Sequence, residues 1–354
     1  MKTLVSFFER LGVRSLLETG WNVAKLSAGT LAFAANDSTP PFAYQAMVRL
    51  YCLTGGYSND FLSGVIRRLR PPYELPHGDG VLGTLDGAQV RTIVSDIENR
   101  GYHVFANRLP DALCDRLLAF ARRTKSVVRA MDSESAPEEP VLYERAKPLG
   151  VRYDFREDDL VNDATVQELM ADLSILSVAQ AYLGCAPILD LVAMWWHTAF
   201  SKSADKTAAQ FYHFDMDRIK WLKFFFYLTD VSAETGPHCF VEGSHRRAQT
   251  PPALLRQGYT RLGDAEVRSH FPPERFIEFT GPRGTIIAED TRGLHKGKHV
   301  AKGDRLMFEL EFTNSLFGGE LPRSALRGTP TDALAALMRR HPRLFGLLRP
   351  ATPS

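Results

Sequence analysis

Apolar side chains near the amino terminus recur at the spacing of an α-helix. They fall at positions i, i+3, i+4 and i+7, which share one helix face: Leu4, Phe7, Phe8 and Leu11. Further helical stretches follow at about 42–54 and 57–69, and a pair of prolines at 71 and 72 ends the second. We expect the first helix to pack against the rest of the protein. Contact with a membrane surface or with a second copy of the chain is the alternative.

After residue 100 the pattern changes to a short strand followed by a helix. The segment GYHVFANRLPDALCDRLLAFARR predicts a strand and then a helix that starts at Pro110. An acidic loop with several prolines follows at 131–148, and a second helix is predicted at about 165–183. A closing helix is predicted with Thr329 as its cap and the next proline at its first position.

Strand-like runs dominate the chain after residue 185. They occupy 188–200, 220–231, 275–280, 284–290 and 304–313. Turn residues, and not regular helices, separate them. The pattern therefore disfavours a parallel sheet and predicts an α+β fold, with an antiparallel two-sheet barrel or sandwich and helices packed outside it. We expect a helical amino-terminal region, a barrel domain, and a carboxy-terminal helix and tail, at 1–85, 86–320 and 321–354.

The charge of the chain gives no overall reason to expect nucleic acid as a partner. Lys and Arg total 43 against 41 Asp and Glu, for a formal net charge of +2. A local basic cluster consists of Arg67, Arg68 and Arg70. No aromatic residues are interleaved with it, so we interpret it as a solvated face and not as a dedicated anion site.

The cysteines and the apolar runs indicate where the protein works. Its four cysteines are widely spaced and form no CxxC pair, so we expect a reducing, cytoplasmic location and neither a zinc knuckle nor a disulfide framework. Charges at Glu9, Arg10 and Arg14 interrupt the apolar start before a secretory signal could form. No stretch approaches the ~20 apolar residues that cross a bilayer, so we expect a soluble protein.

Two side chains that can bind a metal stand two positions apart in the segment QFYHFDMD. In an extended chain, residues i and i+2 project from the same face, so His213 and Asp215 can point at one ion. Two imidazoles and a carboxylate, with open positions opposite them, form the ligand set of non-haem Fe(II) oxygenases. A histidine and an aspartate at this spacing also arise often by chance, so a third ligand is required.

The segment EDTRGLHKGKHVAKGDRLMFELEF offers a third ligand and an anion-binding group. His295 ends one predicted strand, and Arg305 opens another ten positions later, as in a hairpin. Alternation along the second strand separates Leu306, Phe308, Leu310 and Phe312 from Arg305, Met307, Glu309 and Glu311. A guanidinium inside a barrel requires an anionic partner, and its fork geometry suits a carboxylate.

In motif order as well as residue type, residues 98–315 resemble the phytanoyl-CoA dioxygenase family of Fe(II)- and 2-oxoglutarate-dependent oxygenases. The matching features are the GYHVF opening, the HxD segment, the strand FFFYLTDV, the turn GPHCFVEGSHR, the strand GTIIAED, and the distal histidine and arginine. The resemblance implies a double-stranded β-helix (jelly-roll, cupin-like) core with flanking helices. It also implies that His213, Asp215 and His295 bind the metal, that Arg305 anchors 2-oxoglutarate, and that Gln210 lies near this co-substrate.

The resemblance implies a reaction as well. Fe(II), 2-oxoglutarate and O2 would be used to hydroxylate or otherwise oxidise a C–H bond of a small molecule, with release of succinate and CO2. Halogenating relatives replace the carboxylate ligand by a small residue, whereas Asp215 is retained here, which favours hydroxylation or a related oxidation. The aromatic-rich strands favour a substrate that is at least partly apolar.

The chain departs from the family pattern close to the distal histidine. Many members have a hydroxyl residue two positions after it, where this chain has Gly297, and an asparagine nearby that is missing here. Their arginine stands about one position later than Arg305. A Gly-Asp pair of the family is Gly284-Thr285 in this chain. These departures concern how the second carboxylate of 2-oxoglutarate is held.

Other polar residues near these motifs receive more ordinary interpretations. His238 and His245 belong to the GPHCFVEGSHR turn, and His245 is interpreted as a brace for that turn. His197 is interpreted as a core residue more readily than as part of a pocket. The aromatic run at 224–227 is interpreted mainly as core, and Lys223 as a residue that could face inward.

Two alternatives to an oxygenase stay open. A non-catalytic relative that serves as a binding or interaction module would be recognised by a lost ligand, and no ligand is lost here. A cupin-like metal enzyme that does not use 2-oxoglutarate would have no obvious need for Arg305. In either an oxygenase or such an enzyme, the loops at 131–148 and 246–273 are candidate lids over the site.

Overall fold

The computed structural model describes residues 13–75, 79–129, 137–320 and 323–350. The helix predicted from Leu4 to Leu11 and part of the acidic loop lie outside these residues. None of the helices in the described ranges combines the length and the apolar character that crossing a bilayer requires.

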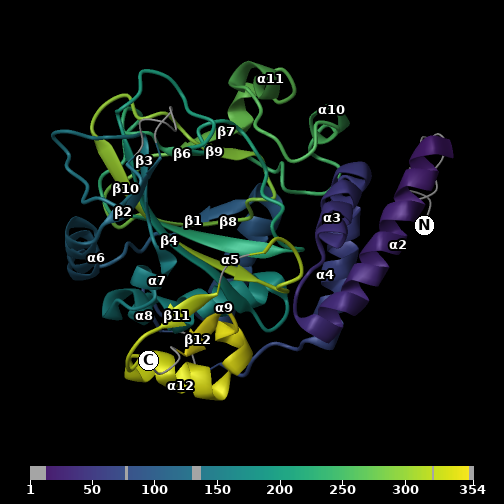
Figure 1. The fold of residues 1–354 in the computed structure, drawn as a ribbon, viewed down its shortest axis with the longest axis horizontal. Coiled ribbons are helices and arrows are strands. Elements are labelled where there is room, and N and C mark those ends of the chain that lie inside the picture. Colours follow the sequence, from purple (N-terminus) through teal and green to yellow (C-terminus); the bar gives the residue numbers. More distant parts are fainter. Residues whose placement is uncertain (1–12, 76–78, 130–136, 321–322, 351–354) are drawn as a thin grey trace.

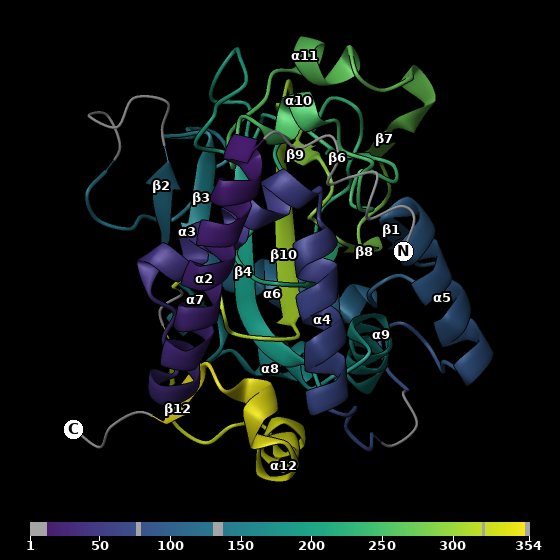
Figure 2. The ribbon, with the colours of Figure 1, turned by 90° about the vertical axis from the view of Figure 1, so that its right-hand side faces the viewer.

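Three amino-terminal helices stand side by side at one edge of the molecule (Figures 1 and 2): α2 (Val13–Asn36), α3 (Pro41–Thr54) and α4 (Tyr57–Leu69). The absence of a side chain at Gly29 lets α2 approach α3 closely, since a Cβ there would lie 2.0 Å from the Cβ of Ala43. Apolar residues of α2 and α3 share a buried cluster with Ile219 and Phe317. Burial of this surface holds the helices against the β-structure, and the two helices predicted for this region are confirmed.

Within the described residues, the central β-structure consists of two antiparallel sheets, and two short strands near the carboxy terminus pair separately and in parallel. The larger sheet has seven strands, in the order β1 (Tyr102–Val104), β8 (Ile286–Glu289), β5 (Trp221–Tyr227), β10 (Asp304–Thr313), β4 (Ile188–Thr198), β3 (Arg152–Phe155) and β2 (Ser126–Arg129). The smaller sheet has three strands, in the order β7 (Phe276–Phe279), β6 (His238–Val241) and β9 (His295–Gly297). In Figure 1 the smaller sheet lies above the larger one. The two layers form the predicted jelly-roll core of an α+β fold.

Helices cover the outer face of the larger sheet (Figure 1): α5 (Gly87–Arg100), α6 (Asp111–Arg123), α7 (Glu157–Leu160), α8 (Ala164–Met170) and α9 (Leu173–Leu183). The main hydrophobic core forms here, and it includes the apolar set predicted for β10: Leu306, Phe308, Leu310 and Phe312. Neighbouring residues on β10 must then face the smaller sheet. Arg305 and Glu309 do so, and both are buried in the space between the sheets.

The remaining elements are short. They are α10 (Pro252–Leu255), α11 (Asp264–Arg268), η1 (Pro273–Arg275), β11 (Ser324–Leu326), α12 (Asp332–Arg340), η2 (Pro342–Phe345) and β12 (Leu348–Pro350). The division of the chain at residues 85 and 320 stays a proposal.

Two predicted helices differ from those in the structure. The helix expected at 165–183 is broken into α8 and α9, because the carboxylate of Asp172 accepts a hydrogen bond from the N–H of Ile175 and so caps a new helix. The closing helix has Thr331 at its cap, not Thr329. The N–H of Thr331 donates to the side chain of Gln167, which holds the backbone extended for two more residues.

Candidate metal centre

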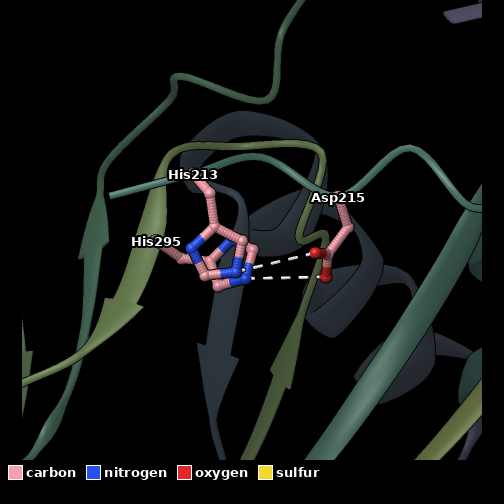
Figure 3. Close-up of side chains that lie close together, drawn as sticks. All are labelled: His213, Asp215 and His295. Carbon is pink, nitrogen blue, oxygen red and sulfur yellow. Dashed lines mark ion pairs between the residues drawn. The ribbon is translucent and has the colours of Figure 1, made fainter. Parts of the chain in front are cut away.

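The two segments that carry the candidate ligands are joined through their backbones. His213 and His295 form an isolated antiparallel bridge, in which each N–H donates to the carbonyl of the other at 3.0 and 2.9 Å. The N–H of Asp215 donates to the carbonyl of Thr291 at 2.8 Å. The three side chains converge on one point (Figure 3), and their potential ligand atoms all lie within 4.8 Å of one another.

Backbone carbonyls orient both imidazole rings. Nδ1 of His213 lies 2.9 Å from the carbonyl of Phe211, and Nδ1 of His295 lies 2.9 Å from that of Gly293. A carbonyl only accepts, so each Nδ1 carries the proton and each Nε2 presents a lone pair. These Nε2 atoms lie 3.7 and 3.5 Å from the carboxylate oxygens of Asp215 (Figure 3). Both rings are therefore held ready to bind a metal through Nε2.

Burial and charge set the protonation states that coordination requires. Burial lowers the pKa of His213 and His295 and keeps both imidazoles neutral. Burial by itself raises the pKa of Asp215, but the ammonium of Lys223, the largest of the opposing charges, holds it well below its usual range. Two neutral imidazoles and one carboxylate, all nearly inaccessible to water, form the donor set that suits Fe(II). Among the described residues no other group of three or more such side chains comes together.

A cavity of about 200 Å³ between the two sheets contains these three residues. Its wall also includes the polar side chains of Arg305, His197, Glu309 and Lys223 and the aromatic side chains of Trp195 and Phe225. Hollows of about 600 and 510 Å³ lie elsewhere on the molecule, but neither contains the candidate ligands. Chemistry and not size therefore identifies the smaller cavity as the site.

The guanidinium of Arg305 is buried and only partly satisfied. It donates through one Nη to the carbonyl of Gly236 and through the other to Nδ1 of His197, at 2.7 Å. Nε2 of His197 lies 3.1 Å from the carbonyl of Ala208, so Nε2 carries the proton and Nδ1 is the acceptor. Burial, with the charge of Arg305 next, lowers the pKa of His197 and keeps it neutral. Nε of Arg305 has no protein partner among the described residues, so it is an available donor for an anion.

His197 and Arg305 both lie beside Gly297. A Cβ on Gly297 would lie 3.4 Å from both the His197 ring and the Arg305 guanidinium. The sequence interpretation favoured a core role for His197, whereas the structure places it in the cavity wall beside Arg305. The two residues are direct partners across β4 and β10, a relation that only the strand register reveals.

Lys223 is surrounded by three carboxylates. Its ammonium lies 3.1 Å from Asp215, 3.0 Å from Glu309 and 3.3 Å from Glu311. The suggestion that Lys223 could face inward agrees with this position. One ammonium among three acidic side chains leaves the wall able to accept further positive charge, as a metal on Asp215 would supply.

The structure also places the other polar residues that the sequence singled out near these motifs. His238, read as part of a turn, lies at the cavity with its Nε2 3.0 Å from the carboxylate of Glu289. His245 contacts the carbonyl of Glu98 at 3.1 Å, away from the cavity. The side-chain oxygen of Gln210 accepts from the N–H of Asp205, and its amide nitrogen has no partner within the described ranges. The roles of Gln210 and of the candidate lids stay predictions.

Comparison with protein families gives one match. The family model described as Phytanoyl-CoA dioxygenase (PhyH) matches residues 97–300. This range contains His213, Asp215 and His295 and ends just before Arg305. No curated protein matches the chain.

Several solved structures are similar at low sequence identity. The non-heme alpha ketoglutarate dependent epimerase SnoN from nogalamycin biosynthesis is 17% identical, with a TM-score of 0.45, over 64% of this chain and 84% of its own. HygX from Streptomyces hygroscopicus, with nickel and 2-oxoglutarate bound, is 16% identical, with a TM-score of 0.44, over 69% and 93%. EctD from S. alaskensis, with bound Fe, is 15% identical, with a TM-score of 0.42, over 72% and 88%. At this level of similarity none of them transfers a substrate or a reaction to this chain.

Proposed function

Because the chain belongs to the phytanoyl-CoA dioxygenase family, we propose that it is an Fe(II)- and 2-oxoglutarate-dependent dioxygenase. It hydroxylates, or otherwise oxidises, a C–H bond of a small, partly apolar molecule and releases succinate and CO2. The observation that carries this proposal is the meeting of His213, Asp215 and His295 in one buried cavity that also contains Arg305.

His213, Asp215 and His295 would hold the ferrous ion. Three protein ligands leave positions for the co-substrate and for dioxygen. When bound, the ion supplies the activation of dioxygen that couples decarboxylation of 2-oxoglutarate to oxidation of the substrate. The two backbone-anchored imidazoles keep the donor atoms in place, since neither ring can turn without breaking its hydrogen bond to a carbonyl.

Arg305 would bind the distal carboxylate of 2-oxoglutarate. Its charge is buried, and the hydrogen bonds of its guanidinium within the described residues go to a carbonyl and an imidazole and not to a carboxylate, so an incoming anion would relieve a costly unpaired charge. His197 and the carbonyl of Gly236 hold the guanidinium in a fixed plane. The charged group is therefore positioned before the co-substrate arrives, which lowers the cost of binding.

The rest of the cavity would receive the prime substrate. Ala193, Trp195 and Phe225 provide an apolar surface, while Glu309 and Lys223 provide polar groups beside it. Glu309 pairs with Ala193 and Phe225 across the neighbouring strands, so the polar and apolar groups stand in one row. This wall supports a substrate that combines an apolar body with a hydrogen-bonding group.

A difference spectrum tests the proposed function directly. Anaerobic addition of Fe(II) and then 2-oxoglutarate to the purified protein is expected to produce a visible metal-to-ligand charge-transfer band, because the keto acid would coordinate a ferrous ion held by the three ligands. Fe(II) with succinate, which lacks the keto group, is the control and should produce no band. A protein that binds iron but develops no band with 2-oxoglutarate would contradict the proposal and favour the cupin-like alternative.

Replacing His197 with phenylalanine is expected to weaken the use of 2-oxoglutarate. The variant leaves a buried N–H of Arg305 without its acceptor, which costs about 1–3 kcal/mol, so the 2-oxoglutarate concentration for half-maximal turnover should rise about 10-fold. The maximal rate should change much less. His197→Asn, whose side-chain oxygen can accept, should recover part of the loss. Steady-state CO2 release at varied 2-oxoglutarate provides the measurement, and a fall in maximal rate alone would contradict a positioning role.

A further inference from the structure

A hollow of about 510 Å³ lies apart from the metal centre, and five of its thirteen lining residues are Lys or Arg. Its lining residues come mainly from α4, the end of α5, α9 and the turn after β6, and Figure 2 shows the three helices. No residue that lines it also lines the metal cavity. Its basic residues are Arg67, Lys220, Arg246, Arg247 and Arg292.

Two of these basic residues are already paired. The guanidinium of Arg292 lies 2.6 Å from the carboxylate of Asp290 and 3.2 Å from that of Asp60. Arg247 lies 3.9 Å from the second oxygen of Asp60. Asp60 and Asp290 are thus already in ion pairs with arginines of the hollow.

Three cations of the hollow have no carboxylate partner. Within the described part of the chain, no carboxylate lies within ion-pair distance of Arg67, Lys220 or Arg246. Glu98 also lines the hollow, but its side chain is exposed to solvent and pairs with none of them. The hollow therefore carries an excess of positive charge, which a bound anion would offset.

Lys220 is the cation that most requires such a partner. Its ammonium donates to the carbonyl of Tyr182 at 3.0 Å and lies 3.9 Å from the centre of the Tyr182 ring. A carbonyl dipole and an aromatic face do not neutralise a charge, and two N–H donors remain. Burial, and then the charge of Arg292, lower the pKa of Lys220 to about 8, against the opposing charges of Asp290, Asp60 and Glu98.

The side chain of Arg67 is packed at the edge of the hollow. A Cβ on Gly184 would lie 2.4 Å from Cδ of Arg67, so the arginine stem rests on this glycine. Arg70, by contrast, donates to the carbonyl of Asn314 at 2.9 Å, and Arg68 does not line the hollow. The cluster that the sequence interpretation treated as one solvated face is therefore divided among different roles.

We propose that this hollow is a binding site for a dianionic phosphoryl group, either free phosphate or a phosphate ester. Lys220, Arg67 and Arg246 come from separate segments of the chain, and all three line the hollow. A phosphoryl group carries several terminal oxygens and a double negative charge, so it can accept hydrogen bonds from more than one cation. The volume exceeds that of phosphate alone, so an ester can bind with part of its organic group inside.

Calorimetric titration of the full-length protein tests this site. Inorganic phosphate is expected to bind one equivalent in a background of chloride at constant ionic strength, and adenosine 5′-monophosphate serves as the ester probe. Tighter binding of the ester would identify an organic phosphate as the ligand, and equal or weaker binding would identify the free ion. The Arg67→Ala/Arg246→Ala variant, which changes only exposed side chains, should bind phosphate at least 10-fold more weakly.

Matched variants separate this site from the metal centre. Arg68→Ala, which removes a neighbouring exposed arginine of α4, should bind phosphate as the wild type does. The double variant should retain the affinity of the wild type for 2-oxoglutarate, and His213→Ala should retain phosphate binding. Phosphate binding that disappears in Arg305→Ala but survives in the double variant would place the anion in the metal cavity and overturn the proposal. Binding no stronger than that of chloride would also overturn it.

Discussion

The His213→Ala variant is expected to lose Fe(II) binding and, with it, all measurable turnover of 2-oxoglutarate. It removes one of three donor atoms that lie within 4.8 Å of one another, and a single imidazole and carboxylate would hold a ferrous ion only weakly. The variant should keep the fold around the site, because the hydrogen bonds that join positions 213 and 295 are between backbone atoms. Iron content after anaerobic desalting and CO2 release from labelled 2-oxoglutarate are the measurements.

His299→Ala is the matched control for this variant. His299 follows β9, and its Nε2 contacts the carbonyl of Ser201 at 2.7 Å, outside the group of candidate ligands. The control should bind one equivalent of iron and turn over 2-oxoglutarate at close to the wild-type rate. If His213→Ala instead kept both iron and turnover, the metal would have to lie elsewhere and the assignment of the centre would be wrong.

The Arg305→Ala variant is expected to need roughly 100-fold more 2-oxoglutarate, because losing one partner of a buried, hydrogen-bonded charge pair costs about 3 kcal/mol. The iron content should be unchanged, since Arg305 is not among the candidate ligands. The charge-transfer band should therefore still form, but only at much higher 2-oxoglutarate concentration. Titration of that band under anaerobic conditions measures the effect on binding separately from any effect on oxidation.

Two further arginine variants show whether the planar geometry of the Arg305 guanidinium or its charge alone is responsible for binding 2-oxoglutarate. Arg305→Lys keeps the positive charge but loses the planar fork, so its 2-oxoglutarate requirement should lie between those of the wild type and the alanine variant. Arg152 lines the same cavity and stacks over Trp195 at 4.4 Å. Arg152→Ala should have a smaller effect than Arg305→Ala. A larger effect at Arg152 would move the co-substrate anchor to that residue.

Local patterns in the sequence predicted elements whose stability depends mainly on their own residues. Helices near 42–54 and 57–69 and the strand at 304–313 appear where the periodicity placed them. The alternation along that strand also separated its core face from its inner face correctly. Helix boundaries were less predictable, because side chains outside the helix can decide them. Gln167, distant in sequence, moves the cap of α12 to Thr331.

The sequence alone determined the donor types, their spacing in the HxD segment, and the presence of one inward arginine on the last long strand. Only the tertiary structure decided that position 213 bridges position 295, that His197 supports Arg305, and that Lys223 stands among Asp215, Glu309 and Glu311. The physical reason is that these contacts depend on the register between strands far apart in the chain. A shift of one residue in any pairing would turn these side chains to the opposite face.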